Sequence, residues 1–237
     1  MMKRKKTVLL GIAAVTLSAC FCAVAILGFD FRGPRTEPID PWIVAAEALG
    51  TQNIISAIYL NVRLFDTIIE VLVFAIAALG VRYYLTARGR RREADAIPES
   101  RVVRVAADVL LPPIVLLGIY IVLHGHLSPG GGFAGGVIAG TGLLLAAIAL
   151  GTETVRSRIS SSVLEWVEWA VLCGIIVLAV VPVTLSRPAL ANPIGPGTMG
   201  RLLSGGTTLL YSMLIGVKVF VGSWVIVRRF IDHRGEI

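Results

Sequence analysis

The chain has 237 residues, of which 56% are hydrophobic and 16% charged, and its mean hydropathy is +0.82. An ordinary soluble domain has about 45–50% apolar and about 25% charged residues, so this composition excludes that class. The net charge of +7 is distributed asymmetrically around the apolar segments, as membrane topology requires. We therefore expect contact with the lipid bilayer and not with nucleic acid.

Six apolar segments are long enough to cross a bilayer, which takes about 20 mostly apolar residues in a helix. We expect an all-α membrane protein with about six transmembrane helices. The predicted spans are Val8–Leu27, Leu64–Leu85, Val102–Leu123, Phe133–Gly151, Leu164–Leu185 and Thr207–Val227.

The first span also resembles a bacterial lipoprotein signal, because Lys3 to Lys6 precede an apolar run that reaches Cys20. A lipoprotein turns polar after the cysteine, whereas here the apolar run continues to Leu27. We therefore favour an uncleaved first helix and leave open whether Cys20 is lipidated. The three cysteines, Cys20, Cys22 and Cys173, have no spacing typical of a disulfide framework or a metal site.

The basic residues predict the orientation, because cytoplasmic loops are enriched in lysine and arginine. With Met1 in the cytoplasm, 16 of the 22 basic residues lie on that side and both termini are cytoplasmic. The cytoplasmic set is Lys3, Arg4, Lys5, Lys6, Arg82, Arg88, Arg90, Arg91, Arg92, Arg101, Arg104, Arg156, Arg158, Arg228, Arg229 and Arg234. The predicted location is the plasma membrane of a prokaryotic cell.

A polar, basic stretch over residues 88–101, containing Pro98, predicts a cytoplasmic linker between a two-helix module (1–87) and a four-helix module (102–237). The segment Phe29–Gly50 predicts an extended loop with a short interfacial helix outside. Nothing in the sequence matches a phosphate-binding loop or a dinucleotide fingerprint. We expect no bound cofactor.

The second predicted span carries the densest group of intramembrane charges. Arg63, Asp66, Thr67 and Glu70 are spaced to share one helix face. In one interpretation Arg63 and Asp66 only neutralise each other at the outer interface. In the other, Asp66 and Glu70 are stations for a proton or a metal cation and Arg63 tunes their affinity.

Lys218 lies near the middle of the last predicted span, between apolar residues. A charge at this depth is costly, by about 2.5–3.5 kcal/mol on insertion scales, and therefore indicates a functional site. A buried lysine can release its proton when a cation approaches. The alternative is a side chain that reaches the interface along its flexible stem.

Three further acidic residues occur in the spans. Asp108 precedes Pro112 and Pro113, a pair that predicts a kink and a polar cavity in the third span. Glu165 and Glu168 begin the fifth span beside tryptophans, and we expect them to lie at the interface and pair with Arg156 or Arg158.

A glycine-rich turn joins the third and fourth spans and contains the most specific string of the chain, Gly125–His126–Leu127–Ser128–Pro129–Gly130–Gly131–Gly132–Phe133. Glycines 132, 136 and 140 recur every four residues, which predicts a flat helix face for close packing. The candidate turn and packing residues are His126, Pro129, Gly130, Gly131, Gly132, Phe133 and Gly136. His124 and His126 have no third ligand nearby in sequence, so we expect no metal site.

This string resembles the GHxSPGGGF signature of the B-type component of Mrp-type multisubunit sodium/proton antiporters, which also occurs in the antiporter-like part of energy-converting hydrogenases. The resemblance covers roughly residues 101–231. It implies a transport subunit without a catalytic site of its own. The implied partners are large A/D-type and small C/F/G-type antiporter components, and the implied transported ions are Na⁺ and H⁺.

The run Asn61–Glu70 resembles the DFRGFDTLGE motif at the end of the large A-type antiporter component, or of the equivalent small hydrogenase subunit. Arg63, Phe65, Asp66, Thr67 and Glu70 match the motif, whereas Asn61, Leu64 and Ile69 depart from it. The chain thus resembles a fusion of two pieces that are often separate. By analogy with the family, Asp66, Glu70 and Lys218 are expected on the ion path, with Arg63 and Asp108 as further candidates.

Two other functions remain open. The same subunit can belong to a redox-driven complex such as a membrane-bound hydrogenase, with hydrogenase-like redox subunits as partners. It can also be a scaffold that holds helices together and conducts no ions.

Overall fold

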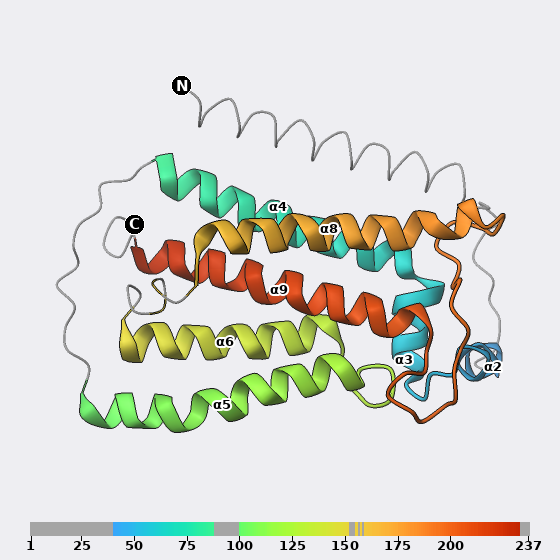
Figure 1. Ribbon diagram of the computed structural model, residues 1–237, viewed down its shortest axis with the longest axis horizontal. Helices are drawn as coiled ribbons and strands as arrows, with labels where there is room; N and C mark the ends of the chain where they lie inside the picture. The colour runs from blue at the N-terminus through green and yellow to red at the C-terminus, as the bar shows by residue number, and fades with distance from the viewer. Residues whose placement is uncertain (1–39, 88–99, 152–154, 156, 158, 233–237) are drawn as a thin grey trace.

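The computed structural model describes residues 40–87, 100–151, 155, 157 and 159–232. Every regular element in these ranges is a helix (Figure 1). The predicted first span, Cys20 and most of the predicted linker lie outside the described residues. The division into two modules stays a prediction.

Five helices are long and apolar enough to cross a membrane. They begin within three residues of the predicted starts, and the predicted all-α membrane fold is confirmed. Their bounds are α4 Leu64–Ala87, α5 Arg101–His124, α6 Gly132–Leu150, α8 Ser161–Thr184 and α9 Thr207–Asp232. The last one continues five residues beyond the predicted end of its span.

The long helices lie side by side, successive helices along the chain run in opposite directions, and α9 is central (Figure 1). It packs against α4, α6 and α8, whereas α5 packs mainly against α6. One end of the bundle, which we call the arginine-rich end, collects the last turns of α4 and α9 and the start of α5. The arginines there are Arg82, Arg101, Arg104, Arg228 and Arg229.

The opposite end, which we call the loop end, carries three short helices and two connecting loops. The short helices are α2 Asp40–Ala48, α3 Ile54–Ala57 and the π-helix η1 Ile58–Val62. Helix α2 is the short helix expected in Phe29–Gly50. The connections 125–131 and 185–206 lie at the same end (Figure 1).

Two apolar clusters fill the bundle. The first joins η1, α4, α8 and α9, and the second joins α6, α8 and α9 around the buried Trp224. Because α4 contributes to the same core as α8 and α9, both predicted modules share one packed interior. The buried members of the first cluster are Leu60, Leu64, Ile68, Val71, Val171, Ile175, Ala179, Tyr211, Ile215 and Val219.

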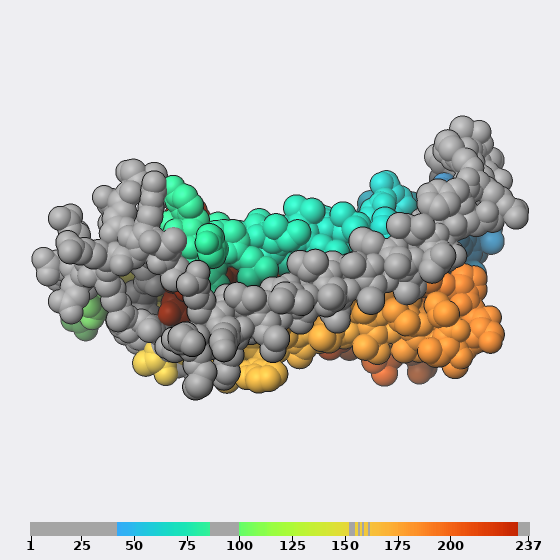
Figure 2. All heavy atoms as spheres, turned by 90° about the horizontal axis from the view of Figure 1, so that it is seen from above, coloured from blue at the N-terminus to red at the C-terminus, as the bar shows by residue number. Residues whose placement is uncertain are grey.

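The outer faces of the bundle expose large apolar side chains. Figure 2 shows α4 and α8 along one side of the bundle. Ile76 of α4 is 67% exposed, and Trp166 of α8 is 77% exposed. Water would oppose such exposure, so these faces require lipid or another apolar surface.

Candidate functional site

Lys218 is fully buried, with no exposed surface. At 1.5 Å per residue it lies about 16 Å from the start of α9 and about 21 Å from its end. The side chain therefore does not reach the interface, and the snorkelling alternative is wrong. A buried ammonium at this depth needs a compensating partner.

That partner is Glu168 of α8, whose carboxylate forms an ion pair with Lys218 Nζ. The Glu168 side chain is only 12% exposed. Phe74 of α4 completes the surroundings, because Nζ lies 6.0 Å from the centre of its ring, within the range of a cation–π contact. Three helices thus meet at one buried pair of opposite charges.

The expected pairing of the two α8 carboxylates with Arg156 or Arg158 lies outside the described residues and stays a prediction. Glu168 pairs with Lys218, and Glu165 pairs with Arg82 of α4. Helix periodicity explains these two pairs, because positions 165 and 168 are three residues apart and lie on one face of α8, toward α4 and α9. The Arg82–Glu165 pair is more accessible, with side chains 37% and 48% exposed.

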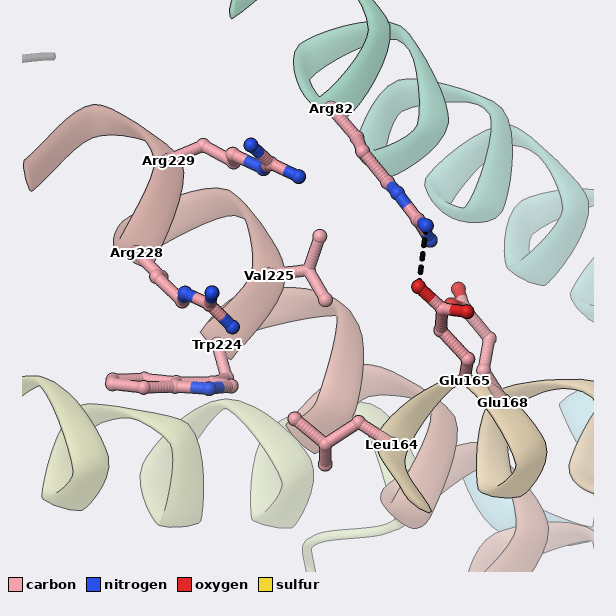
Figure 3. Close-up of a pocket in the computed structure, with 8 residues that line it drawn as sticks. All are labelled: Arg82, Leu164, Glu165, Glu168, Trp224, Val225, Arg228 and Arg229. Carbon is pink, nitrogen blue, oxygen red and sulfur yellow. Dashed lines mark hydrogen bonds and ion pairs between the residues drawn. The ribbon is translucent and has the colours of Figure 1, made fainter. Parts of the chain in front are cut away.

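A pocket of about 60 Å³ lies at the arginine-rich end, between α4, α8 and α9. Glu165 and Glu168 project into it from one side, and Arg82, Arg228 and Arg229 line other parts of its wall (Figure 3). The buried Trp224 forms part of the wall. The pocket therefore connects the more exposed Arg82–Glu165 pair to the carboxylate that holds Lys218.

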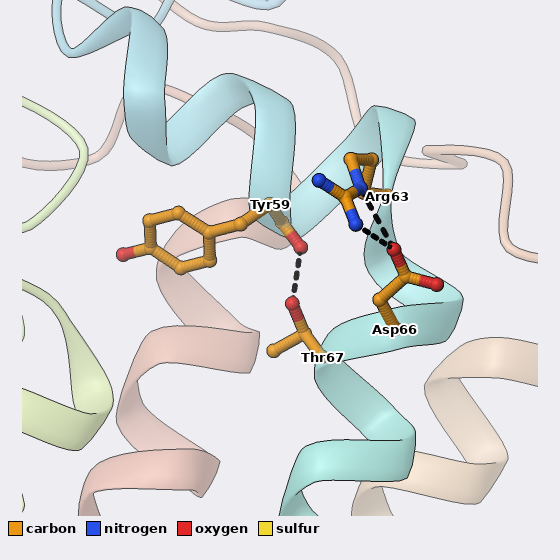
Figure 4. Close-up of polar contacts among 4 residues, drawn as sticks. All are labelled: Tyr59, Arg63, Asp66 and Thr67. Carbon is orange, nitrogen blue, oxygen red and sulfur yellow. Dashed lines mark hydrogen bonds and ion pairs between the residues drawn. The ribbon is translucent and has the colours of Figure 1, made fainter.

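The charges at the start of α4 are arranged differently. Arg63 Nε donates a hydrogen bond of 2.7 Å to Asp66 Oδ2 (Figure 4), and the two side chains are 66% and 55% exposed. Exposed ion pairs contribute about 0–1 kcal/mol. The geometry supports the interpretation in which Arg63 and Asp66 neutralise each other.

The chain changes direction between η1 and α4, and hydrogen bonds hold this bend. Thr67 Oγ1 donates to the carbonyl of Tyr59 at 2.6 Å (Figure 4), which satisfies a backbone acceptor near the π-helical turn. Asn61 Nδ2 donates to Thr208 Oγ1 of α9 at 2.7 Å. The motif residues Asn61 and Thr67 thus have structural roles that the sequence pattern did not reveal.

Glu70 and Asp108 are exposed on the surface of this chain. Glu70 lies on α4 two turns beyond the bend, and Asp108 lies on the outer helix α5, which continues through Pro112 and Pro113. Neither carboxylate is close enough to Lys218 for an ion pair within the described residues. The structure does not bring the five predicted ion-path residues into one site.

The glycine-rich turn contacts the α3–η1 segment and its N-cap residue Asn53 at the loop end. Asn53 Nδ2 donates to the carbonyls of Gly125 and Ser128 at 2.8 and 2.9 Å. The backbone at Gly130 and Gly131 has positive φ, and a Cβ at Gly131 would lie 2.2 Å from the Tyr59 hydroxyl oxygen. A side chain at that position would therefore displace the Tyr59 ring, and the positive φ itself favours glycine.

Glycines of α6 allow close approach to α9. A Cβ on Gly132 would lie 2.5 Å from the Ser212 carbonyl oxygen, and one on Gly136 would lie 2.6 Å from that of Gly216. Both distances are to backbone atoms, which cannot move without the helix. The remaining turn residues differ in burial: Pro129 is exposed, and Phe133 is half-buried with its ring edge-to-face against Phe74 at 6.4 Å.

His126 is fully buried at the loop end, and its backbone carbonyl accepts a hydrogen bond from Asn53 N at 3.1 Å. Its Nε2 lies 3.5 Å from the Arg201 carbonyl oxygen, and its Nδ1 has no partner among the described residues. Burial lowers the pKa of His126 below its usual value of 6.5. The imidazole is thus held neutral at the junction of two loops.

We expect the purified protein to lose stability as the pH falls below about 6.5. The unfolded state then binds a proton that folded His126 resists, so the stabilisation is present above the unfolded pKa and is lost as the pH falls toward the lower folded pKa. Thermal unfolding across this range checks the effect. His126→Gln is expected to reduce the pH dependence, whereas the same change at His124 is expected to preserve it.

The sequence contains a pattern that indicates a buried position for Glu168. Leu164, Glu168, Val171, Ile175 and Ala179 follow the i, i+4, i+7, i+11, i+15 spacing of one helix face. The four apolar members of this stripe are buried. A carboxylate within such a stripe indicates a charge that faces the bundle interior, and Lys218 is the only lysine within any of the predicted spans.

The chain is similar to known membrane subunits. Residues 102–225 match the family described as a domain related to the MnhB subunit of Na⁺/H⁺ antiporter. A probable A/B-type subunit of a K⁺/H⁺ antiporter from Rhizobium meliloti is 27% identical over 147 residues, covering 52% of this chain and 15% of the relative. The B-type subunit of the Na⁺/H⁺ antiporter from Bacillus subtilis is 38% identical over 56 residues, covering 24% and 39%.

Two solved complexes contain chains of similar fold. One, in the membrane-bound sulfane sulfur reductase, an archaeal respiratory membrane complex, has a TM-score of 0.71 and 29% identity over 97% of this chain and 98% of its own length. The other, in the Mrp complex from Dietzia, has a TM-score of 0.64 and 21% identity over 99% of this chain and 27% of its own length, and shows the fold alone.

This chain spans 15% of the Rhizobium relative and 39% of the Bacillus relative. The family match nevertheless covers more than half of this chain and includes α5, α6, α8 and most of α9. Five helices able to span a membrane agree with it. The chain belongs to the family of membrane domains related to the MnhB subunit of Na⁺/H⁺ antiporters.

Proposed function

We propose that this chain is an integral membrane component of an antiporter-like complex in which the Lys218–Glu168 pair exchanges protons inside the membrane. The observation that carries the proposal is a fully buried lysine paired with a nearly buried glutamate near the middle of a spanning helix. A pair of apolar residues would fill the same space at a lower desolvation cost. Retaining two charges there favours a role that only titratable groups can perform.

The pair has two states that differ by one proton transfer. In the charged state Lys218 carries the proton and Glu168 is a carboxylate. Transfer from Nζ to the carboxylate oxygen gives a neutral amine and a neutral acid, which the low dielectric of the interior favours more than water does. A nearby charge can therefore shift the proton from one group to the other.

The exposed carboxylates belong to a different part of the proposed mechanism. Glu70 and Asp108 lie on helices at membrane depth, where a charge normally faces protein or a water-filled cavity. We infer that neighbouring subunits cover them and that Glu70 lies on a cation path shared with a partner. The proposed partners are large A/D-type and small C/F/G-type antiporter components, and the proposed transported ions are Na⁺ and H⁺.

The family indicates transport and not catalysis. We propose that the chain binds no cofactor, that any catalytic centre of the complex lies in other subunits, and that both termini face the cytoplasm. The orientation is supported by the arginines gathered at one end of the bundle.

Full-length similarity to a chain of a respiratory complex favours a second arrangement, in which the subunit works in a redox-driven complex. Purification of the tagged chain in mild detergent, followed by mass spectrometry, distinguishes the two. Antiporter subunits alone support a free-standing exchanger, whereas added iron–sulfur subunits support redox coupling. A stable homo-oligomer without other subunits contradicts both.

Replacing Glu168 by glutamine tests the proton-exchange role. We expect Glu168→Gln to reduce cation-dependent proton transport by about 100-fold, the usual scale for a positioned proton-transfer group, while the complex still assembles. The measurement is quenching of a pH-sensitive dye in inverted membrane vesicles. Glu47→Gln, on exposed α2, is the matched control, and equal transport in both variants would contradict the proposal.

A further inference from the structure

The pocket at the arginine-rich end reaches the buried pair from one side. Glu168 lines the pocket and also holds Lys218. The half-exposed Arg82–Glu165 pair lies beside it at the mouth (Figure 3). A volume of about 60 Å³ admits water, because a single water needs only about 10–15 Å³ of such space and at least two polar partners.

The other side of Lys218 is closed by apolar packing. Toward the loop end, Ile215 and Tyr211 of α9 are 2% and 1% exposed. Leu64 and Val71 of α4 are each 1% exposed and belong to the same cluster. A tightly packed apolar layer contains no partners for water, so among the described residues the pocket is the route by which water reaches the buried pair.

The charges around the pocket discriminate between protons and alkali cations. Its lining combines Arg82, Arg228 and Arg229 with two carboxylates, and both carboxylates already have cationic partners. An alkali cation needs several free oxygen ligands and is repelled by an excess of positive charge. A proton needs only one acceptor oxygen and a chain of water molecules.

We propose that this pocket is a proton entrance that connects the arginine-rich surface of the membrane to Glu168 and excludes alkali cations. When Lys218 is a neutral amine, a hydronium ion of the pocket water gives its proton to Glu168 and becomes water, and Glu168 passes the proton to the amine, which restores the ion pair. This inference rests on the proposed function and adds the side of access and the exclusion of alkali cations.

Cysteine labelling in the assembled complex tests the entrance without measuring transport. The endogenous thiols are removed as Cys20→Ala, Cys22→Ala and Cys173→Ala. Val225→Cys then places a thiol in the pocket wall. Val71→Cys, of the same size, places one in the closed apolar layer on the other side of Lys218. The probes are an anionic and a cationic methanethiosulfonate, both membrane-impermeant, applied to inside-out and right-side-out vesicles.

We expect Val225→Cys to react in inside-out vesicles only, and faster with the anionic reagent by roughly threefold or more, because the mouth is positively charged. Replacing choline chloride by NaCl at equal ionic strength is expected to leave the rate unchanged. Val71→Cys is expected to stay unlabelled from both sides.

Three results would overturn the entrance: no labelling of Val225→Cys, faster reaction with the cationic reagent, or protection by Na⁺. The two proposals fail separately. If Glu168→Gln is inactive while Val225→Cys is unreactive, the result supports proton exchange by the Lys218–Glu168 pair and contradicts the proposed entrance. If Glu168→Gln transports normally while Val225→Cys reacts as expected, the pocket is open to water but the proton-exchange role is contradicted. The pocket is then not a proton entrance.

Discussion

Lys218→Met is expected to abolish cation-coupled proton transport and to destabilise the protein by about 3–5 kcal/mol, because it leaves the Glu168 carboxylate buried without its partner. Methionine keeps the length and apolar stem of lysine, so the change removes the charge with little change in packing. The measurements are dye quenching in inverted vesicles and thermal unfolding of the purified complex.

A double substitution separates the structural contribution from the transport role. Lys218→Met combined with Glu168→Gln removes both charges, and we expect it to recover much of the stability lost in the single variant, since no unpaired charge remains. Transport is expected to stay absent. If the double variant transports protons, the buried pair only holds α8 and α9 together and the proposed exchange is wrong.

Val217→Ala is the matched control for the lysine substitution. Val217 is the neighbour of Lys218 on α9, and its side chain is 41% exposed on the outer face of the helix. Its truncation leaves the ion pair untouched, so transport is expected to stay within about twofold of the unmodified complex, as for most exposed substitutions.

The spans were predictable because the membrane imposes a strong local rule. An apolar run of about 20 residues identifies a helix without knowledge of its neighbours. For the same reason α9 was placed correctly while its last turn was not. That turn contains Arg228 and Arg229 and continues as helix beyond the apolar run, where hydropathy no longer marks the end.

The partner of Lys218 was not predicted, because the pairing depends on how α8 packs against α9. Lys218 and Glu168 are 50 residues apart, and the tryptophans beside Glu168 favoured an interfacial position. For Asp66 and Glu70 the shared helix face was predictable from spacing. Spacing alone did not show that this face is exposed on the chain and that Arg63 compensates Asp66 locally.

The second large effect is expected from Gly136→Ala, because helix α6 has no room for a side chain where it crosses α9. The new Cβ would lie 2.6 Å from the Gly216 carbonyl oxygen and 2.8 Å from the Val219 Cβ. Overpacking of this kind destabilises by about 1–3 kcal/mol. We expect a lower midpoint of thermal unfolding for the purified complex.

Gly80→Ala is the matched control, since a Cβ at Gly80 of α4 meets nothing within 4 Å. Alanine is the better helix former by about 1 kcal/mol, so this variant is expected to be at least as stable as the unmodified protein. An equal loss of stability in Gly80→Ala and Gly136→Ala would mean that the α6–α9 contact is looser than the structure shows.

Gly136 also connects packing to the proposed chemistry. Gly216 and Val219 flank Lys218 on α9, so the shift of α9 that relieves the clash also changes the position of Nζ relative to Glu168. We therefore expect Gly136→Ala to lower transport by more than its loss of stability alone explains, measured per assembled complex. Val219→Ala added to it removes the 3.1 Å contact with Val219 Cγ1 but keeps the contacts with Val219 Cβ and the Gly216 carbonyl oxygen, and is expected to restore only part of the transport. Full restoration would show that side-chain crowding, and not backbone approach, sets the position of the lysine.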